Sequence, residues 1–507
     1  MDLTGARVLV RAGVLRPVRP DRLIGMAAAV ARWGLTPASG YAAGAARHPD
    51  RIALIDEEGP LTFREIDRRT DRLAGELRAR GVHEASAVGL LARNSRGFVE
   101  ASVALSKCGA DVLYLNTGFA GGQLQGVLDR EKAIAVVHDA EFTDLLSLSA
   151  EGRLMVTTEE LSGLAETSTQ PAPPKTDHAP RMVILTSGTT GAPKGSARSG
   201  ASIDDVISVL STIPLKAGET TVIAAPVFHA WGLAHLALGM LLGSTVVLQR
   251  KFEPAKVLEA IEEHQATTLI VVPVMLDKLL QAEPRNTASL RVIASSGSAL
   301  PGELATRTLE KLGPVLYNLY GSTEAAYAAI ATPDDLAEDP QTAGRPPYGV
   351  SIRIVDEQGK PVPDGTPGLV YVGGPMSFEG YTDGSDKARL DGLVATGDLG
   401  VIDEKGRLKV LGRDDDMVVI GGENVYPGQV EDALLSHEGV TDVAVTASED
   451  PSFGTKLVAH VVGKADEEEL KALVRDQVAR FAVPREFRFV DELPRNATGK
   501  VLKKDLR

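Results

Sequence analysis

The chain has 507 residues, 43% of them apolar and 24% charged, so it is too long for one hydrophobic core and predicts at least two globular domains. Its formal charge of −14 argues against a general nucleic-acid-binding protein. The single cysteine, Cys108, excludes an intramolecular disulfide and a thiolate zinc site, fits a reducing compartment and is expected to be a core residue.

Residues 1–40 are expected to form a basic arm. Its apolar sequence is interrupted by two prolines and six arginines, which argues against a signal peptide, and no run in the chain approaches the roughly 20 apolar residues that cross a bilayer. Two interpretations stay open: the arm contacts an anionic membrane, or it packs on its own domain. The predicted location is cytoplasmic, with peripheral contact at the inner membrane surface under the first interpretation. The arginines are Arg7, Arg11, Arg16, Arg19, Arg22 and Arg32.

From Tyr41 to about Asp177 helical and strand-like segments alternate, for example a helix over 63–80 and a strand over 88–91. A proline-rich connector follows at 166–175. Further apolar runs then alternate with helical stretches and predict a mostly parallel sheet, with a nucleotide at its carboxyl edge. These runs lie at 222–225, 245–248, 269–272 and 291–294.

Residues 344–412 consist of short β-rich runs with Gly and Pro turns, which predict a small β-barrel. After Gly412 a compact α+β pattern begins, with strands near Val443 and Leu457 and an amphipathic helix over 467–480. The predicted fold class is therefore α/β. A large N-terminal domain, 1–412, holds layered sheets and the barrel, and a mobile C-terminal domain spans 413–507.

A phosphate-binding loop is predicted where the apolar strand at 182–185 runs into Thr186-Ser-Gly-Thr-Thr-Gly-Ala-Pro-Lys-Gly195. Its glycines let backbone N–H groups turn inward, its hydroxyls add donors, and Lys194 adds a positive charge. Pro193 before this lysine and Gly195 after it exclude a Walker A loop. A Gly-rich surface loop is the alternative. The candidate nucleotide-binding residues are Thr186, Ser187, Gly188, Thr189, Thr190, Gly191 and Lys194.

The segment Leu319-Tyr-Gly-Ser-Thr-Glu-Ala325 gathers an aromatic ring, two hydroxyls and a carboxylate. Tyr320 is suited to stack on adenine, Thr323 to bond the α-phosphate or the substrate carboxylate, and Glu324 to hold Mg²⁺. Alone, the segment also fits an ordinary turn with capping residues. Its glycine and first hydroxyl, Gly321 and Ser322, are counted as nucleotide-binding.

These motifs and Leu493-Pro-Arg-Asn-Ala-Thr-Gly-Lys500 occur in the order found in the adenylate-forming superfamily, which the chain resembles over about residues 41–507. The resemblance is greatest to medium- and long-chain fatty acyl-CoA synthetases and implies ATP, Mg²⁺ and coenzyme A. It implies that the loop with Gly297 and Ser298 lies against adenine and the acyl group. It also assigns Asp398 to the ribose hydroxyls and Arg413 to holding the sugar.

Phe228-His-Ala-Trp-Gly232 distinguishes among such enzymes, because amino-acid-activating domains typically have Phe-Asp at this motif. An amino acid substrate is therefore disfavoured. The implied acyl pocket comprises Phe228, His229, Trp231, Gly297 and Ala325. The apolar run at 233–242 suits an acyl chain, although a buried structural helix has the same pattern, and His229 also fits a core histidine.

The resemblance implies that Lys500 enters the site only when the small domain closes. The attacking carboxylate is already ionised at neutral pH, so adenylation needs charge neutralisation rather than a general base. Lys194, Lys500 and Mg²⁺ supply it, and Thr323 and His229 complete the catalytic candidates. Rotation about a hinge at Asp415 is implied to withdraw Lys500 and bring in a loop whose glycines, Gly421 and Gly422, leave room for pantetheine.

The predicted function is ATP-dependent activation of a carboxylic acid, a medium- or long-chain fatty acid, to acyl-AMP and then to acyl-CoA. Two alternatives stay open: an acyl-AMP ligase that loads a carrier protein, and a non-catalytic acyl-nucleotide sensor. The stretch at 378–398 is shorter than is usual in the family and lacks an aromatic residue before Thr396-Gly-Asp398. No rotation-blocking insertion is present, which favours free coenzyme A. The acyl chain length, the oligomeric state and the pathway do not follow from the sequence.

Overall fold

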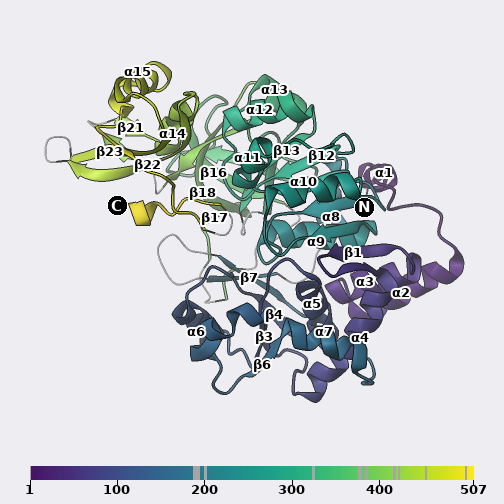
Figure 1. Ribbon diagram of the computed structural model, residues 1–507. Helices are drawn as coiled ribbons and strands as arrows, with labels where there is room; N and C mark the ends of the chain where they lie inside the picture. The colour runs from purple at the N-terminus through teal and green to yellow at the C-terminus, as the bar shows by residue number, and fades with distance from the viewer. Residues whose placement is uncertain are drawn as a thin grey trace. The chain divides into compact units, whose positions relative to one another are not determined.

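The computed structural model describes residues 2–186, 194–198, 203–322, 326–374, 380–382, 386–414, 418–420, 423–450, 454–496 and 499–506 (Figure 1). The chain forms two compact units. Unit 1 comprises Met1–Val271, Lys278–Ala294 and Pro375–Lys387. Unit 2 comprises Val272–Asp277, Ser295–Gly374 and Ala388–Arg507.

The N-terminal arm of unit 1 is helical: α1 (Leu3–Arg11) and α2 (Pro20–Trp33) precede α3 (Pro37–Arg47). The Asp2 carboxylate caps α1 by accepting a hydrogen bond from the Gly5 N–H at 2.8 Å, and Pro20 occupies the first turn of α2. Helix α2 packs on α3, both in purple in Figure 1, and buries Trp33. The arm therefore packs on its own unit, as one of the two interpretations expected.

The first sheet of unit 1 has the order β6-β5-β3-β4-β7-β8, with β8 antiparallel to β7 and the other neighbours parallel. Helices α4, α5 and α7 lie together beside it (Figure 1). Thr62 and Glu65 form a capping box at the start of α4. The elements are β3 (Ala87–Leu91), β4 (Asp111–Tyr114), β5 (Ala135–His138), β6 (Leu154–Thr157), β7 (Met182–Thr186), β8 (Lys194–Arg198), α4 (Phe63–Ala79), α5 (Arg96–Cys108), α6 (Gly121–Arg130) and α7 (Thr158–Thr167).

The second sheet of unit 1 has the order β12-β11-β9-β10-β1-β2. Strands β11, β9, β10 and β1 are parallel, and β2 is antiparallel to β1. The predicted parallel sheet is confirmed, with strand ends shifted by at most two residues. The elements are β1 (Ile52–Asp56), β2 (Gly59–Thr62), β9 (Thr220–Ile223), β10 (Thr245–Leu248), β11 (Thr268–Val271), β12 (Val292–Ser295), α8 (Ile203–Thr212), α9 (Ala230–Leu242), α10 (Pro254–Glu263) and α11 (Pro273–Gln281).

Unit 2 holds an antiparallel pair, β13 and β14, and a five-stranded antiparallel sheet in the order β15-β16-β18-β17, with β19 paired to β18. Among the described strands this sheet does not close on itself, so the predicted small β-barrel is instead an open antiparallel sheet. The elements are α12 (Gly302–Leu312), β13 (Leu316–Ser322), β14 (Ala326–Ala331), α13 (Pro333–Glu338), β15 (Ser351–Val355), β16 (Gly368–Gly373), β17 (Arg389–Leu390), β18 (Leu393–Ile402) and β19 (Leu408–Arg413).

The C-terminal part of unit 2 has its own α+β core, in which Val430, Val445, Leu457 and Leu470 are all at most 1% exposed. The predicted amphipathic helix is α15, which ends at Gln477 rather than at residue 480. The elements are β20 (Val418–Ile420), β21 (Glu423–Val425), α14 (Pro427–Leu435), β22 (Val440–Asp450), β23 (Gly454–Gly463), α15 (Glu467–Gln477) and β24 (Glu486–Phe489).

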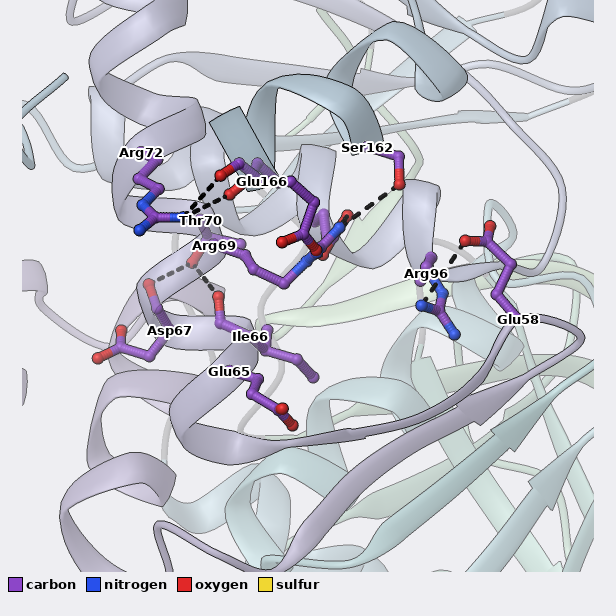
Figure 2. A network of polar contacts seen from close by, with 12 residues as sticks. Glu58, Glu65, Ile66, Asp67, Arg69, Thr70, Arg72, Arg96, Ser162 and Glu166 are labelled. Atoms are coloured by element: carbon purple, nitrogen blue, oxygen red, sulfur yellow. Dashed lines mark hydrogen bonds and ion pairs between the residues drawn. The ribbon is translucent and has the colours of Figure 1, made fainter. Parts of the chain in front are cut away.

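Buried charges join α4, α5 and α7 in unit 1. Arg69 forms an ion pair with Glu100, which is 1% exposed. Arg69 also pairs with Glu166 and contacts Ser162 (Figure 2). Burial raises the pKa of Glu100, and the Arg69 guanidinium opposes that rise. Lys107 is fully buried and pairs with Asp67 at 2.7 Å. Removing one partner of such a pair would leave the other charge buried and unpaired and so lower the stability of this helix cluster.

Cys108 is fully buried, and burial raises the pKa of its thiol to about 12. Its Sγ contacts the Ala74 carbonyl oxygen at 3.4 Å. This placement agrees with a core residue rather than a nucleophile. Within the part of the chain that the structure describes, no helix is both long and apolar enough to cross a bilayer.

Candidate active site

Three predicted nucleotide-binding residues, Tyr320, Asp398 and Arg413, meet in unit 2. The β18–β19 register places Asp398 opposite Arg413, and Arg413 Nη1 lies 3.4 Å from Asp398 Oδ1. The Tyr320 hydroxyl, from β13, donates a hydrogen bond to the same carboxylate. Gly397, directly before Asp398, has φ +80°, and a Cβ there would lie 3.0 Å from the Arg413 guanidinium, so the close approach requires glycine.

The charges and hydrogen-bonding groups of Tyr320, Asp398 and Arg413 are suited to bind a neutral diol. Burial raises the pKa of Asp398, while the Tyr320 hydroxyl and Arg413 oppose the rise. Burial and the Asp398 charge raise the pKa of Tyr320, so its hydroxyl stays a donor. A carboxylate that accepts beside a guanidinium that donates matches the hydroxyls and ring oxygen of a ribose. The donor set therefore fits a nucleotide.

The Tyr320–Asp398 hydrogen bond was not anticipated from the sequence, which assigned Tyr320 only to adenine stacking. No local signal indicates it, because 78 residues separate the two partners and the bond depends on where β13 lies. Gly321 and Ser322 end β13, and a register shift lies between Tyr320 and Gly321.

The loop with Gly297 and the loop with Lys500 approach the same valine in unit 2. Gly297 has φ +95°, and a Cβ there would lie 3.2 Å from Val272; Ser298 beside it is half-buried. A Cβ at Gly499 would lie 3.7 Å from Val272 and would overlap Val274. The structure therefore brings these two predicted site segments close together, around a valine that the sequence did not single out.

The loop that carries Lys500 is held by its own backbone and by an ion pair. The Asn496 N–H donates to the Lys500 carbonyl at 2.9 Å, and the Lys500 N–H donates to the Asn496 side chain at 2.9 Å. Arg495 contacts both Asp442 carboxylate oxygens at 2.7 Å. The Lys500 side chain is exposed, so it is available to a ligand.

Three of the predicted acyl-pocket residues, Phe228, His229 and Trp231, lie in unit 1 around the start of α9. Gly297 lies in unit 2, and Ala325 is outside the described residues. His229 precedes α9 and is half-buried, and desolvation lowers its pKa to about 4, so the ring is neutral. Its Nε2 has no hydrogen-bond partner among the described residues. The ring centroids of Phe228 and His229 lie 4.5 Å apart, and Trp231 Nε1 donates to the Val271 carbonyl at 2.9 Å. His229 is thus an uncharged imidazole in apolar surroundings.

Asn94 positions this segment and was missed in the sequence. Its amide donates to the carbonyls of Ile223 at 3.3 Å and Ala225 at 2.9 Å, and it accepts from the Val227 N–H at 2.9 Å. Asn94 is buried and follows β3, a strand of the first sheet, whereas β9 belongs to the second sheet. A lone Asn in a loop carries no sequence signal for this role.

The predicted phosphate loop is the connection between β7 and β8, which pair Thr186 with Lys194. These two residues are described by their backbone alone. Gly195 accepts a hydrogen bond from the Thr382 N–H at 2.8 Å, and Thr382 Oγ1 contacts Glu131 at 2.7 Å. The predicted residues outside the described part of the chain are Ser187, Gly188, Thr189, Thr190, Gly191, Thr323, Glu324, Ala325, Asp415, Gly421 and Gly422.

Two family models match the chain: that of the AMP-binding enzymes over residues 41–382 and that of the AMP-binding enzyme C-terminal domain over 429–500. The chain belongs to the AMP-binding enzyme family. This AMP-binding enzyme is 34% identical over 474 residues to a feruloyl-CoA synthase of Amycolatopsis, an alignment that covers 90% of the chain and 96% of that relative. It is 31% identical over 465 residues to a 2-succinylbenzoate–CoA ligase of Bacillus licheniformis, with 90% and 97% covered.

Solved structures agree with this family. The AMP-binding enzyme has a TM-score of 0.84 and 29% identity to o-succinylbenzoate CoA synthetase (MenE) from Bacillus subtilis in complex with the acyl-adenylate intermediate, covering 92% of the chain and 97% of that structure. The same synthetase in complex with ATP and magnesium ion gives a TM-score of 0.83 at 29% identity, with 92% and 98% covered.

The predicted superfamily and enzyme class are confirmed. The AMP-binding enzyme is an AMP-forming acid–thiol ligase that activates a carboxylic acid with ATP and Mg²⁺ and transfers the acyl group to coenzyme A. The described residues contain no cluster of three or more His, Cys, Asp or Glu side chains suited to a metal, and the predicted Mg²⁺ ligand, Glu324, lies outside them.

Asp398→Asn is expected to raise KM for ATP by about 10–100-fold, because hydrogen bonds to a charged group contribute about 1.5–3 kcal/mol. Pyrophosphate release at varied ATP measures this. The matched control is Asp391→Asn in the turn before β18, whose exposed carboxylate pairs with Arg353 at 2.6 Å. Asp391 has φ +49°, which Asn tolerates. An unchanged KM for ATP in a folded Asp398→Asn protein would contradict the ribose assignment.

Proposed function

We propose that this ligase activates a hydrophobic carboxylic acid that carries no amino group. The observation that supports this most is the environment of His229, which is half-buried and neutral, with its Nε2 shielded from solvent and its ring against Phe228. A substrate ammonium group would need an acidic partner, which an uncharged environment of this kind does not offer.

We propose an aromatic acid as the first candidate. The curated relatives named above are a feruloyl-CoA synthase and a 2-succinylbenzoate–CoA ligase, and both names contain an aromatic acid. A medium- or long-chain fatty acid, which the sequence predicted, is the second candidate. It is favoured by α9, whose 13 residues include no Asp, Glu, Lys or Arg, and whose His235 is buried with its pKa lowered to about 4.

The proposed reaction has two displacements. A carboxylate oxygen attacks the α-phosphorus of ATP, the bond to the bridging oxygen breaks, and pyrophosphate leaves. The thiolate sulfur of coenzyme A then attacks the acyl carbon, the bond to AMP breaks, and the thioester forms. Asp398 and Arg413 hold the ribose, and Tyr320 stacks on the adenine.

Charge neutralisation in the first displacement is proposed for Lys194 and Lys500, with Thr323 as an added donor. Mg²⁺ neutralises charge on the phosphates when bound, and Glu324 is its proposed ligand. Residues 1–412 and 413–507 are the proposed domains, with a hinge at Asp415. After the hinge turns, Gly421 and Gly422 would leave room for the pantetheine arm.

The test is pyrophosphate release with ATP and Mg²⁺ across benzoate, ferulate, 2-succinylbenzoate and fatty acids from acetate to stearate, with and without coenzyme A. We expect thioester formation by mass spectrometry, with kcat/KM for an aromatic or long-chain acid at least about tenfold above that for acetate, since each buried methylene contributes about 0.8 kcal/mol. Acyl-AMP without thioester would instead support a carrier-protein acceptor. No release with any acid would support the sensor.

A further inference from the structure

A basic cavity lies between the N-terminal arm and the end of α3. Its volume is about 210 Å³, and its lining includes Arg16, Arg19, Arg22, Arg47, His48 and Arg51. No acidic residue is among the described residues that line it. Since a water molecule needs only about 10–15 Å³ on this scale, the cavity has room for a phosphate group.

Four of the five arginines of this cavity form no ion pair within the described part of the chain. Buried arginines elsewhere in unit 1 pair with carboxylates, as Arg96 does with Asp56. Within the described ranges, Arg16, Arg22, Arg47 and Arg51 form no ion pair. Three of them donate to carbonyl oxygens instead: Arg22 to Arg47 at 2.9 Å, Arg47 to Val14 at 3.1 Å and Arg51 to Gly243 at 3.2 Å. The remaining member, Arg19, pairs with Asp21 at 3.1 Å in an exposed contact, which is worth little.

Burial and the crowding of like charges perturb the half-buried members of the cavity, Arg47 and His48. Arg47 Nε is buried without a hydrogen-bond partner among the described residues. Burial, followed by the charges of Arg51 and Arg16, lowers the pKa of Arg47. Burial and three of these arginines lower the pKa of His48 to about 4. A bound anion would supply the missing charge and a partner for Arg47 Nε.

The helix beside the cavity exposes apolar side chains. From Leu23 to Ala31, α2 carries no charged residue, although Leu23 is 57% exposed and Ile24 is 70% exposed. The water-facing side of a soluble helix normally carries charged or polar residues. Half of the exposed large apolar side chains in the described residues, seven of fourteen, lie in the arm: Leu3, Val10, Leu15, Leu23, Ile24, Val30 and Leu35.

We propose that residues 2–35 of the N-terminal arm dock the protein on an anionic phospholipid surface. A lipid phosphate then occupies the arginine cavity, and the exposed face of α2 lies in the membrane interface. Either feature alone fits other ligands: soluble phosphate would fill the cavity, and a second copy of the chain would cover the apolar face. A phospholipid surface satisfies both at once, because it presents phosphate beside an apolar layer.

The test is flotation of the full-length protein with vesicles of phosphatidylcholine alone or with added phosphatidylglycerol. We expect binding only with phosphatidylglycerol. The triple variant Arg16→Gln, Arg19→Gln, Arg22→Gln is expected to bind about 10–100-fold more weakly, and Leu23→Ser with Ile24→Ser is expected to weaken binding without changing its salt dependence. The matched charge control is Arg68→Gln, Arg475→Gln, Arg480→Gln, all at exposed positions, which should bind like the wild type.

Thioester formation from a soluble acid is the fold check, since none of these residues has a role in the ligase site. Equal binding of the two triple variants would overturn the proposal. Calorimetric binding of inorganic phosphate without flotation would overturn it in favour of a soluble anion. A concentration-dependent dimer that Leu23→Ser and Ile24→Ser abolish, again without flotation, would overturn it in favour of self-association.

Discussion

Lys500→Ala is expected to lower acyl-AMP formation by about 10²–10³-fold while the protein still converts supplied acyl-AMP and coenzyme A to the thioester. Removing one preorganised donor to a developing charge typically has an effect of this size. The side chain is exposed on a loop held by Asn496, so its loss should not disturb the fold. The second displacement has no attack of a carboxylate on a phosphate and does not need this lysine.

The two half-reactions are measured separately, by pyrophosphate release for adenylation and by mass spectrometry of the thioester for transfer. The matched control is Lys504→Ala, four residues later on the same exposed terminus, which should retain both half-reactions. Equal loss of both half-reactions in Lys500→Ala would remove the proposed alternation between two domain positions.

Arg69→Leu is expected to lower the free energy of unfolding of unit 1 by about 3–5 kcal/mol, because it leaves the buried Glu100 carboxylate without its cation. Replacing both Arg69 and Glu100 by leucine should recover much of the loss, since no buried charge then remains. The only two tryptophans, Trp33 and Trp231, lie in unit 1, so fluorescence during urea unfolding reports on this unit.

The control for this variant is Arg68→Leu, one residue earlier and exposed, which should change stability by no more than about 0.5 kcal/mol. The loss in Arg69→Leu should also shrink as the pH falls. Burial raises the folded pKa of Glu100 and Arg69 opposes that rise, so the folded pKa of Glu100 is higher in the variant than in the wild type. A fall in pH from above these pKa values therefore stabilises the folded variant more than the folded wild type. An equal loss at pH 5 and pH 8 would contradict this account.

The sequence predicted those elements whose causes are local. Helix α4 appears within one residue of the expected range because Thr62 and Glu65 cap it and Ile66, Leu73 and Leu77 bury one face. The predicted start of the proline-rich connector, residue 166, was less accurate, because α7 continues to Thr167. Glu166 in this last turn pairs with Arg69 of α4, a helix far away in the sequence. Tertiary pairing of this kind leaves no trace in the local pattern.

The candidate site divides in the same way. Motif order identified the family because each motif is a short contiguous string. The sequence also predicted that the arm is basic, but not that Arg47 and Arg51, from α3 and the segment after it, complete a cavity with the arm. The substrate stayed undecided, since the acyl side depends on packing around His229 rather than on any string of residues.

Asn94 ties the loop before Phe228 to the end of β3 and so connects the carboxyl edges of the two sheets in unit 1. We therefore expect the position of His229 to depend on both sheets and not only on α9, the helix that it precedes. Substrate preference in this enzyme should therefore respond to substitutions around β3, well outside the acyl-binding motif. A search for altered specificity that randomises only residues 228–231 would leave out Asn94 and the other residues near β3 that position this segment.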